Sequence, residues 1–80
     1  MALKSVMAQL PGIFYRQPSP GQPEFVKEGD TVVAGDTVGI IEVMKTFNAV
    51  AAEEAGRIVR FLVENEEAVM AGDPLYEIEV

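Results

Sequence analysis

The sequence predicts an all-β fold, a pseudo-two-fold β-sandwich or flattened barrel. Short runs rich in β-branched residues alternate with turn-forming residues along the chain, and no segment shows helical periodicity. The second half of the chain also repeats the pattern of the first. Eighty residues are the length of one small domain, so we expect a single domain over residues 1–80.

Eight strands are expected, each bounded by turn formers such as the Ala-Gly-Asp triplets at 34–36 and 71–73. They are placed at residues 4–8, 12–16, 31–33, 37–43, 46–51, 56–63, 67–70 and 74–80. In the last of them Tyr76, Ile78 and Val80 alternate with glutamates, which is the pattern of a half-buried strand.

The internal repeat relates the two halves residue by residue. A shift of 37 residues aligns Ala34-Gly35-Asp36 with Ala71-Gly72-Asp73, and Glu42-Val43 with Glu79-Val80. Ahead of this block the match continues at a shift of 44 residues, with Gly12 on Gly56 and Arg16 on Arg60. If Ile78 and Val80 face inward, the repeat predicts that Ile41 and Val43 also face inward and that Glu42 faces solvent.

The change of shift from 37 to 44 residues implies about seven extra residues in the first half, within residues 17–25. This insertion contains three prolines and a glycine. Proline fixes φ and removes a backbone donor, so we expect a stiff protruding loop and no strand. On composition alone it is either an ordinary surface loop or a loop that carries function.

Between the strands expected at 37–43 and 46–51 only Met44 and Lys45 remain, which leaves room for a two-residue hairpin turn. Such turns need positive φ at both positions and favour Asn-Gly, so Met-Lys costs about 1–2 kcal/mol per residue. A broken local rule of this kind points to function. A lysine at a hairpin apex offers an amine on a flexible stem that another enzyme can acylate, although a solvated turn lysine remains the alternative.

Composition excludes several classes of function. The net charge of −7, from 13 acidic and 6 basic residues, disfavours binding to nucleic acid. The absence of cysteine excludes a disulfide scaffold and a thiolate metal site, and the absence of histidine argues against acid–base catalysis. No apolar run approaches the ~20 residues of a membrane span. We therefore expect no catalytic residue, no metal, no nucleic-acid partner and no membrane partner.

Two segments resemble one family. Glu42-Val43-Met44-Lys45 resembles the Glu-Ala-Met-Lys biotin-attachment motif of biotin carboxyl carrier domains. Phe14-Tyr15-Arg16-Gln17-Pro18-Ser19-Pro20 resembles the segment leading into the thumb of the carriers of bacterial and plastid acetyl-CoA carboxylases. The resemblance covers about residues 4–80. It departs from the motif at Val43, where alanine is commonest, and at Thr46, where methionine or leucine is usual.

The resemblance implies a flattened barrel of two four-stranded antiparallel sheets and a carrier that catalyses nothing itself. It also implies covalent attachment of biotin to Lys45 and a recognition motif made by Glu42, Val43 and Met44. The thumb would lie over the biotin ring system through Pro18, Ser19, Pro20 and Gly21.

The partners implied by the resemblance are three enzymes. A biotin protein ligase attaches biotin, a biotin carboxylase loads it with carboxyl, and a carboxyltransferase takes the carboxyl group from carboxybiotin. The implied location is the bacterial cytoplasm or the plastid stroma.

Two alternatives stay open at this point. The first is a lipoyl-type swinging-arm carrier, whose motif has aspartate before the lysine and alanine after it. Met44 and Thr46 occupy those places here, which favours biotin. The second alternative is an unmodified β-sandwich binding module.

Overall fold

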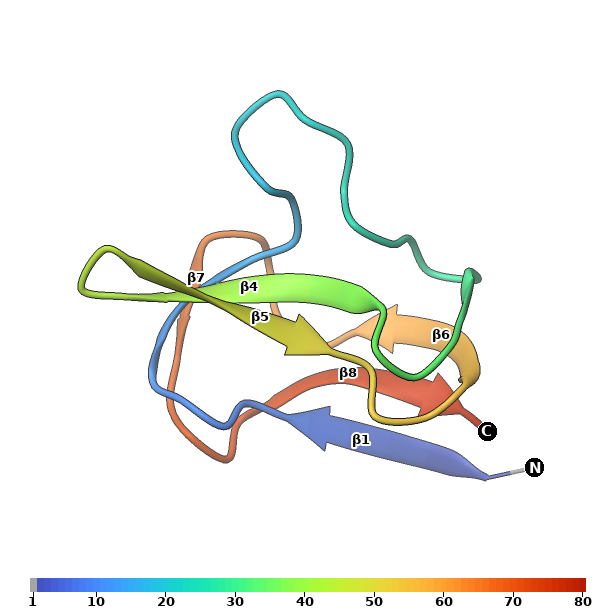
Figure 1. Cartoon of the computed structure of the whole chain (residues 1–80). Helices are drawn as coiled ribbons and strands as arrows, with labels where there is room; N and C mark the ends of the chain where they lie inside the picture. Colours follow the sequence, from blue (N-terminus) through green and yellow to red (C-terminus); the bar gives the residue numbers. More distant parts are fainter. Residues whose placement is uncertain (1) are drawn as a thin grey trace.

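All regular structure in the computed structural model, which describes residues 2–80, is β-strand. The eight strands form two four-stranded antiparallel sheets, which confirms the predicted fold class (Figure 1). The strands are β1 (Leu3–Met7), β2 (Gly12–Tyr15), β3 (Thr31–Val32), β4 (Thr37–Val43), β5 (Thr46–Ala51), β6 (Gly56–Phe61), β7 (Glu67–Val69) and β8 (Pro74–Glu79). The described residues hold no helix that could cross a membrane.

The strand order of the two sheets confirms the internal repeat. One sheet has the order β1-β8-β6-β3 and the other has the order β5-β4-β2-β7. If each strand is exchanged for its partner four strands away in sequence, the first order becomes the second. The halves of the chain are therefore interleaved, so that each sheet takes two strands from each half.

The predicted bounds hold for β4 and β5, and the other strands differ from the prediction by one or two residues. Strand β1 covers Leu3–Met7 and not 4–8, because its ladder with β8 begins at Leu3, opposite Glu79, and ends at Met7, opposite Pro74. Ala8 has left the ladder and donates its N–H to the carbonyl of Asp73, at 2.8 Å. Strand β6 ends at Phe61, two residues earlier than predicted.

Two β-bulges occupy equivalent places in the repeat. Val38 is the extra residue where β4 pairs with β5, and Leu75 is the extra residue where β8 pairs with β1. Both side chains are fully buried. In β8 this places Leu75 inside together with Tyr76, so the simple alternation predicted for that strand breaks at its start.

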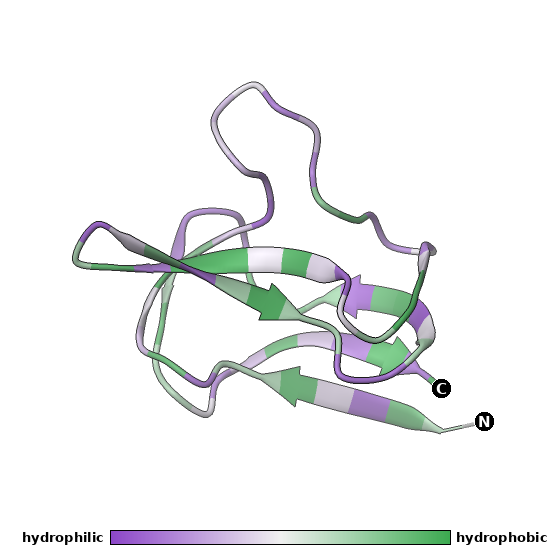
Figure 2. Cartoon of the chain, in the orientation of Figure 1, coloured by the Kyte–Doolittle hydropathy of each residue, from purple (hydrophilic) through white to green (hydrophobic). Residues whose placement is uncertain are grey.

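The core lies between the sheets and is made of apolar side chains from both halves. Its largest fully buried members are Tyr76, Phe14, Ile58, Leu75, Ile78, Val32 and Val38. Ile41 is buried and Val43 packs against this cluster, as the repeat predicted. Figure 2 shows hydrophobic residues interspersed with hydrophilic ones along the strands, as expected when each sheet has one face on the core and one in water.

The buried Tyr76 gives one testable prediction. Its ring packs on Phe61, with centroids 5.8 Å apart, but its hydroxyl has no hydrogen-bond partner among residues 2–80. Tyr76→Phe is expected to raise the free energy of unfolding by about 1 kcal/mol, because it removes a buried, unsatisfied polar group. Urea denaturation at neutral pH measures this, and an unchanged or lowered value would contradict it.

The same substitution has a pH dependence. Burial, and then the charge of Glu53, raise the pKa of Tyr76 above its usual value. The unfolded state therefore ionises at a lower pH than the folded state. As a result, the free energy of unfolding of the wild type is unaffected by this group below about pH 10 and decreases at higher pH. Phenylalanine does not titrate, so the advantage of Tyr76→Phe should grow as the pH rises above 10.

The turn at residues 64–67 gives a second prediction. Glu66 has a φ of +67°, whereas its equivalent in the repeat is Gly29, with a φ of +96°. Glu66→Gly is expected to stabilise the fold by about 0.5–1 kcal/mol, because the relieved left-handed strain exceeds the added entropy of glycine in the unfolded chain. Glu64→Gly, in the same turn, is the control in urea denaturation and should not stabilise.

Candidate functional site

The apex of the β4–β5 hairpin consists of Met44 and Lys45, as predicted. Their φ angles are +49° and +68°, so both residues adopt the left-handed conformation that two-residue turns between antiparallel strands require. In Figure 1 this hairpin projects at one end of the molecule, and the C-terminus lies at the other, beside the start of β1. The backbone groups of Ala2 and Val80 are hydrogen-bonded to each other there, at 2.8 and 2.9 Å.

The strained turn is held by the strands on either side of it. Strands β4 and β5 pair from Thr37 and Ala51 up to Val43 and Thr46, directly below the turn. Asn48 adds a side-chain clamp, because its Nδ2 donates to the carbonyls of both Ile41 and Thr46, at 3.3 Å each. The pairing of the two strands therefore compensates for the unfavourable free energy of holding two non-glycine residues at positive φ.

The side chains at the apex are exposed, and two of them, Met44 and Phe47, are large and apolar. Met44 is 93% exposed and Phe47 is 62% exposed, and Lys45 between them is also exposed. Lys45 takes part in none of the ion pairs formed within residues 2–80. Its amine therefore projects into solvent from a small apolar surface that an enzyme can bind.

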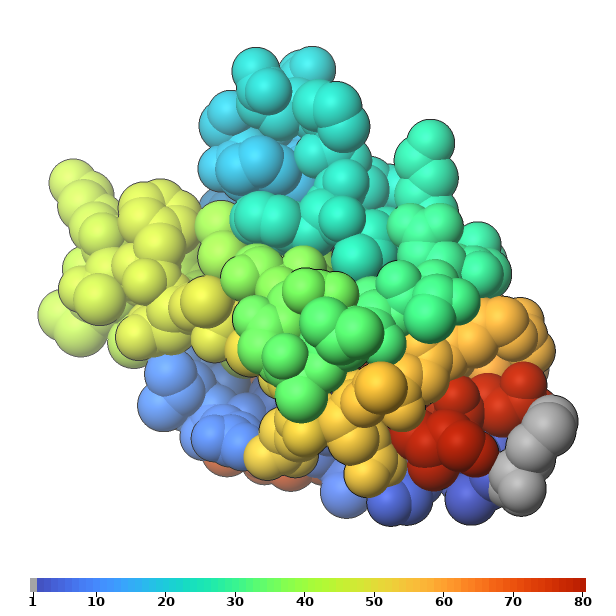
Figure 3. All heavy atoms as spheres, turned by 45° about the vertical axis from the view of Figure 1, so that its right-hand side comes forward, coloured from blue at the N-terminus to red at the C-terminus, as the bar shows by residue number. Residues whose placement is uncertain are grey.

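The insertion at residues 17–25, named the thumb segment from here on, contains no strand and projects from the sandwich (Figure 1). Its base is closed by the N–H of Phe25, which donates to the carbonyl of Arg16 at 2.9 Å. Near its tip the N–H of Gln22 donates to the carbonyl of Ser19 at 3.1 Å. Figure 3 shows the thumb segment and the hairpin apex as two separate projections of one surface.

A groove of about 510 Å³ lies between the thumb segment and the outer face of the hairpin. It is lined by Tyr15, Gln17, Pro18, Ser19, Pro20, Gly21, Ile40, Glu42, Phe47, Asn65 and Glu66. The structure thus brings the predicted thumb residues together with Glu42. Val43, Met44 and Lys45 are not part of the lining, and Lys45 lies just beyond the groove, two residues from Phe47.

Glu42 differs from its prediction. It does lie on the face opposite Ile41, but it is half-buried instead of fully in solvent. Phe47 pairs with it across the hairpin, and the hydroxyl of Tyr15 donates to its Oε1 at 3.0 Å. This hydrogen bond, followed by desolvation and the charges of Glu42 and Glu66, raises the pKa of Tyr15.

Six lining residues of the groove were not among the site residues predicted from the sequence: Tyr15, Gln17, Ile40, Phe47, Asn65 and Glu66. Alternation on the paired strands could have placed Tyr15 and Phe47 on the same outer face as Glu42. Asn65 and Glu66 belong to the turn after β6, about 50 residues from the thumb segment in sequence. Only the tertiary fold brings them to the groove, where Asn65 Nδ2 donates to Gln17 Oε1 at 3.3 Å.

The model of one protein family, described as "Biotin-requiring enzyme", matches residues 5–78. The chain is similar to the chloroplastic biotin carboxyl carrier protein of acetyl-CoA carboxylase from Glycine max, with 47% identity over 77 residues. That alignment covers 96% of this chain and 28% of the relative. The corresponding carrier protein of Nostoc sp. is 42% identical, and the alignment covers 95% of this chain and 42% of that relative.

Two solved structures share the fold. The urea carboxylase of Kluyveromyces lactis superposes with a TM-score of 0.80 and 32% identity, over 99% of this chain and 6% of that one. A single-chain, multi-domain long-chain acyl-CoA carboxylase superposes with a TM-score of 0.79 and 33% identity, over 95% of this chain and 7% of that one. The chain spans less than half the length of the carrier proteins named above. With its family model matched over nearly all of its length, the chain belongs to the biotin/lipoyl family described as "Biotin-requiring enzyme".

Proposed function

We propose that Lys45 is the biotin attachment residue, linked to biotin by an amide at Nζ. In this proposal residues 1–80 form one biotin carboxyl carrier domain, with residues 17–25 as its thumb. One observation supports it most directly: Lys45 stands at the apex of a two-residue hairpin whose two residues are both held at positive φ. A ligase can reach such a lysine without unfolding any part of the sandwich.

The groove beside the apex fits the prosthetic group. Biotin has a flexible aliphatic stem and a compact bicyclic head with polar ureido groups. Pro18, Phe47 and Ile40 supply apolar lining, and the side chain of Asn65 and the exposed backbone near Ser19 supply polar groups. Phe47 lies on β5 only two residues after Lys45, so the groove is within reach of the lysine stem extended by that of biotin.

The proposed role is that of the carrier domain of acetyl-CoA carboxylase, as the names of the similar carrier proteins indicate. Bound biotin would take up a carboxyl group at one enzyme and release it at another. The chain itself supplies the attachment amine, the rigid hairpin below it and the groove beside it. Tethering raises the local concentration of the head at each site the arm reaches, so the domain acts without catalysing a step.

The partners we propose are a biotin protein ligase, a biotin carboxylase and a carboxyltransferase. The similar carriers come from chloroplasts and from bacteria, which supports the plastid stroma or the bacterial cytoplasm as the location. The family includes lipoyl carriers by name, so lipoylation is the competing modification. The carrier proteins similar to this chain support biotin.

Intact mass spectrometry tests the proposal. The purified chain is incubated with ATP and either a biotin protein ligase plus biotin or a lipoate ligase plus lipoate, followed by peptide mapping. The expected result is one biotin adduct on the peptide that contains Lys45 and no lipoyl adduct. A folded chain that gains no biotin, or gains it on Lys4 or Lys27, would sink the proposal.

A further inference from the structure

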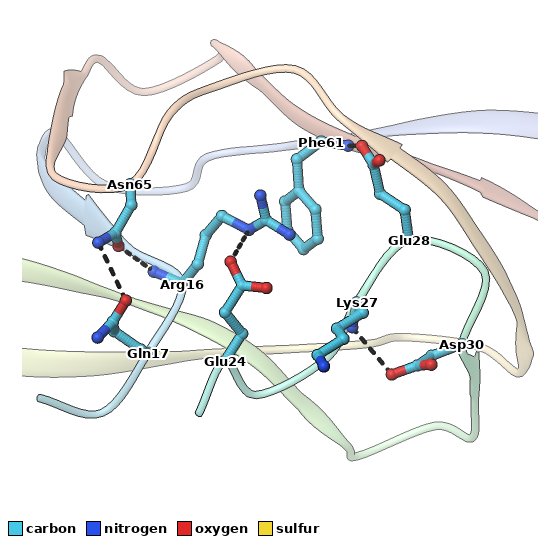
Figure 4. A network of polar contacts seen from close by, with 8 residues as sticks. All are labelled: Arg16, Gln17, Glu24, Lys27, Glu28, Asp30, Phe61 and Asn65. Carbon is cyan, nitrogen blue, oxygen red and sulfur yellow. Dashed lines mark hydrogen bonds and ion pairs between the residues drawn. The ribbon is translucent and has the colours of Figure 1, made fainter. Parts of the chain in front are cut away.

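Arg16 stands where the thumb segment leaves the sandwich, and its side chain faces inward. Only 19% of that side chain is exposed. Its guanidinium carbon lies 3.9 Å from the centroid of the Phe61 ring, and its Nε lies 3.4 Å from Oε2 of Glu24 (Figure 4). The cation is therefore held between an aromatic face of β6 and a carboxylate at the far end of the thumb segment.

Phe61 connects this contact to the core. Its ring is 5.8 Å from that of Tyr76 and 6.3 Å from that of Phe14, and both of those residues are fully buried. Its N–H also donates to Oε2 of Glu28, at 2.9 Å, in the segment that follows the thumb (Figure 4). The surface on which Arg16 rests is thus a fixed part of the sandwich.

The backbone of Arg16 joins both ends of the thumb segment. Its N–H donates to Oδ1 of Asn65 at 2.7 Å, and its carbonyl accepts from the N–H of Phe25 at 2.9 Å. Asn65 in turn donates to the side chain of Gln17, the first residue of the segment (Figure 4). The first and last residues of the thumb segment are therefore both connected to Arg16 by hydrogen bonds, the first through Asn65 and the last directly.

The tip of the thumb segment has little else to hold it. Residues 18–23 are all exposed, and the hydrogen bonds found there are internal to the loop, from Gln22 and Gln17 to the carbonyl of Ser19. A loop with few buried contacts moves unless its base fixes it. The position of the groove wall formed by Pro18 to Gly21 therefore depends on the contacts at the base.

We propose that Arg16 is a positioning residue that holds the thumb segment as a preformed wall of the groove, so that the biotinylated arm docks onto a surface that is already ordered. This inference rests on the proposed attachment of biotin to Lys45. Preorganisation strengthens docking because no loop has to be ordered when the head arrives. Without the anchor, the groove would exist for only part of the time, and the docked fraction would fall by that factor.

The side chain required for this role is arginine. The planar guanidinium lies over the ring of Phe61 and within ion-pair distance of Glu24 at the same time, while its buried Nε makes no hydrogen bond among residues 2–80. Lysine keeps the charge but offers a compact ammonium without a face to stack. Methionine keeps the apolar stem and loses both the charge and the stack.

The repeat supplies a matched control. Arg60 occupies the position equivalent to Arg16, on β6, and pairs with Glu77 through its Nε at 2.5 Å. Its side chain is 61% exposed, and the second half of the chain has no insertion there. Arg60→Met therefore removes the same side chain from the equivalent position of the repeat without touching the thumb segment.

The test uses ¹⁵N-labelled chain, unmodified and fully biotinylated as verified by mass, for wild type, Arg16→Met, Arg16→Lys and Arg60→Met. Two NMR quantities are measured at the amides of Ser19 and Gly21: the order parameter in the unmodified chain and the shift change on biotinylation. We expect Arg16→Met to lower the order parameter and to reduce the shift change by about fivefold. Arg16→Lys should lie between Arg16→Met and wild type, and Arg60→Met should match wild type.

Several results would overturn the inference. A thumb segment as ordered in Arg16→Met and Arg16→Lys as in wild type would remove the anchoring role. An unreduced shift change, or an equal loss in Arg60→Met, would show that Arg16 has no specific effect on docking. If Arg16→Met does not fold, Arg16→Lys alone decides. If wild type gains no mass on Lys45, the proposed function falls, and the docking role of Arg16 falls with it.

Discussion

Lys45→Arg is expected to abolish biotinylation by a biotin protein ligase, with no adduct detectable by intact mass. Arginine retains the positive charge and the long stem, but its guanidinium stays protonated and is not a nucleophile at neutral pH. The turn should still form, since the backbone conformation of this position depends on the paired strands below it. The rate of adduct formation, measured beside Lys4→Arg and Lys27→Arg, checks the prediction, and both of these variants should be modified at the wild-type rate.

A displaced lysine makes the same prediction sharper. In the double variant Met44→Lys, Lys45→Met the amine is still at the apex but is moved by one residue. We expect at least a hundredfold loss in rate, because a displacement of about 1 Å can already cost that factor at a reacting centre. Modification of this variant at the wild-type rate would show that the ligase needs only an exposed lysine, and that the apex geometry is irrelevant.

Gly39→Ala is expected to destabilise the fold by about 3 kcal/mol, which is a large share of the stability of a domain this small. A Cβ at Gly39 would lie 2.6 Å from two ring atoms of Phe14 and 3.0 Å from the carbonyl of Tyr15. Phe14 is fully buried and cannot move aside. The free energy of unfolding from urea denaturation measures the loss.

A double-mutant cycle provides the control for this second prediction. Phe14→Leu removes the ring that the new methyl group meets, at the expense of a cavity. If steric overlap is the cause, Gly39→Ala should cost clearly less in the Phe14→Leu background than in wild type. Equal costs in the two backgrounds would mean that the overlap is not what destabilises Gly39→Ala.

Much of the fold could be predicted because its determinants are local or repeated. Val38 and Leu75, which are equivalent under the 37-residue shift, both lie in the core. The bulges at these residues could not be predicted, because an extra residue in a ladder is defined by its partner strand and leaves no signature in its own sequence.

The candidate site divides in a similar way. The apex could be predicted because only two residues separate the flanking strands, so Met44 and Lys45 had no other place to lie. The groove could not be predicted beyond its thumb residues and Glu42. Asn65 reaches it from the other half of the chain, and Arg16, just after β2, meets Phe61 of β6 although β2 and β6 belong to different sheets.

The β4–β5 hairpin apex lies at the opposite end of the sandwich from the start of β1 and the C-terminus, which has a mechanical consequence (Figure 1). A connection made through Ala2 or Val80 would act as one pivot and the lysine stem as a second, with a stiff β body of up to 37 Å between them. A stiff spacer extends reach without adding conformations, whereas a flexible chain of equal span dilutes its cargo over a growing volume. The domain would thus act as a rigid spacer between two flexible connections.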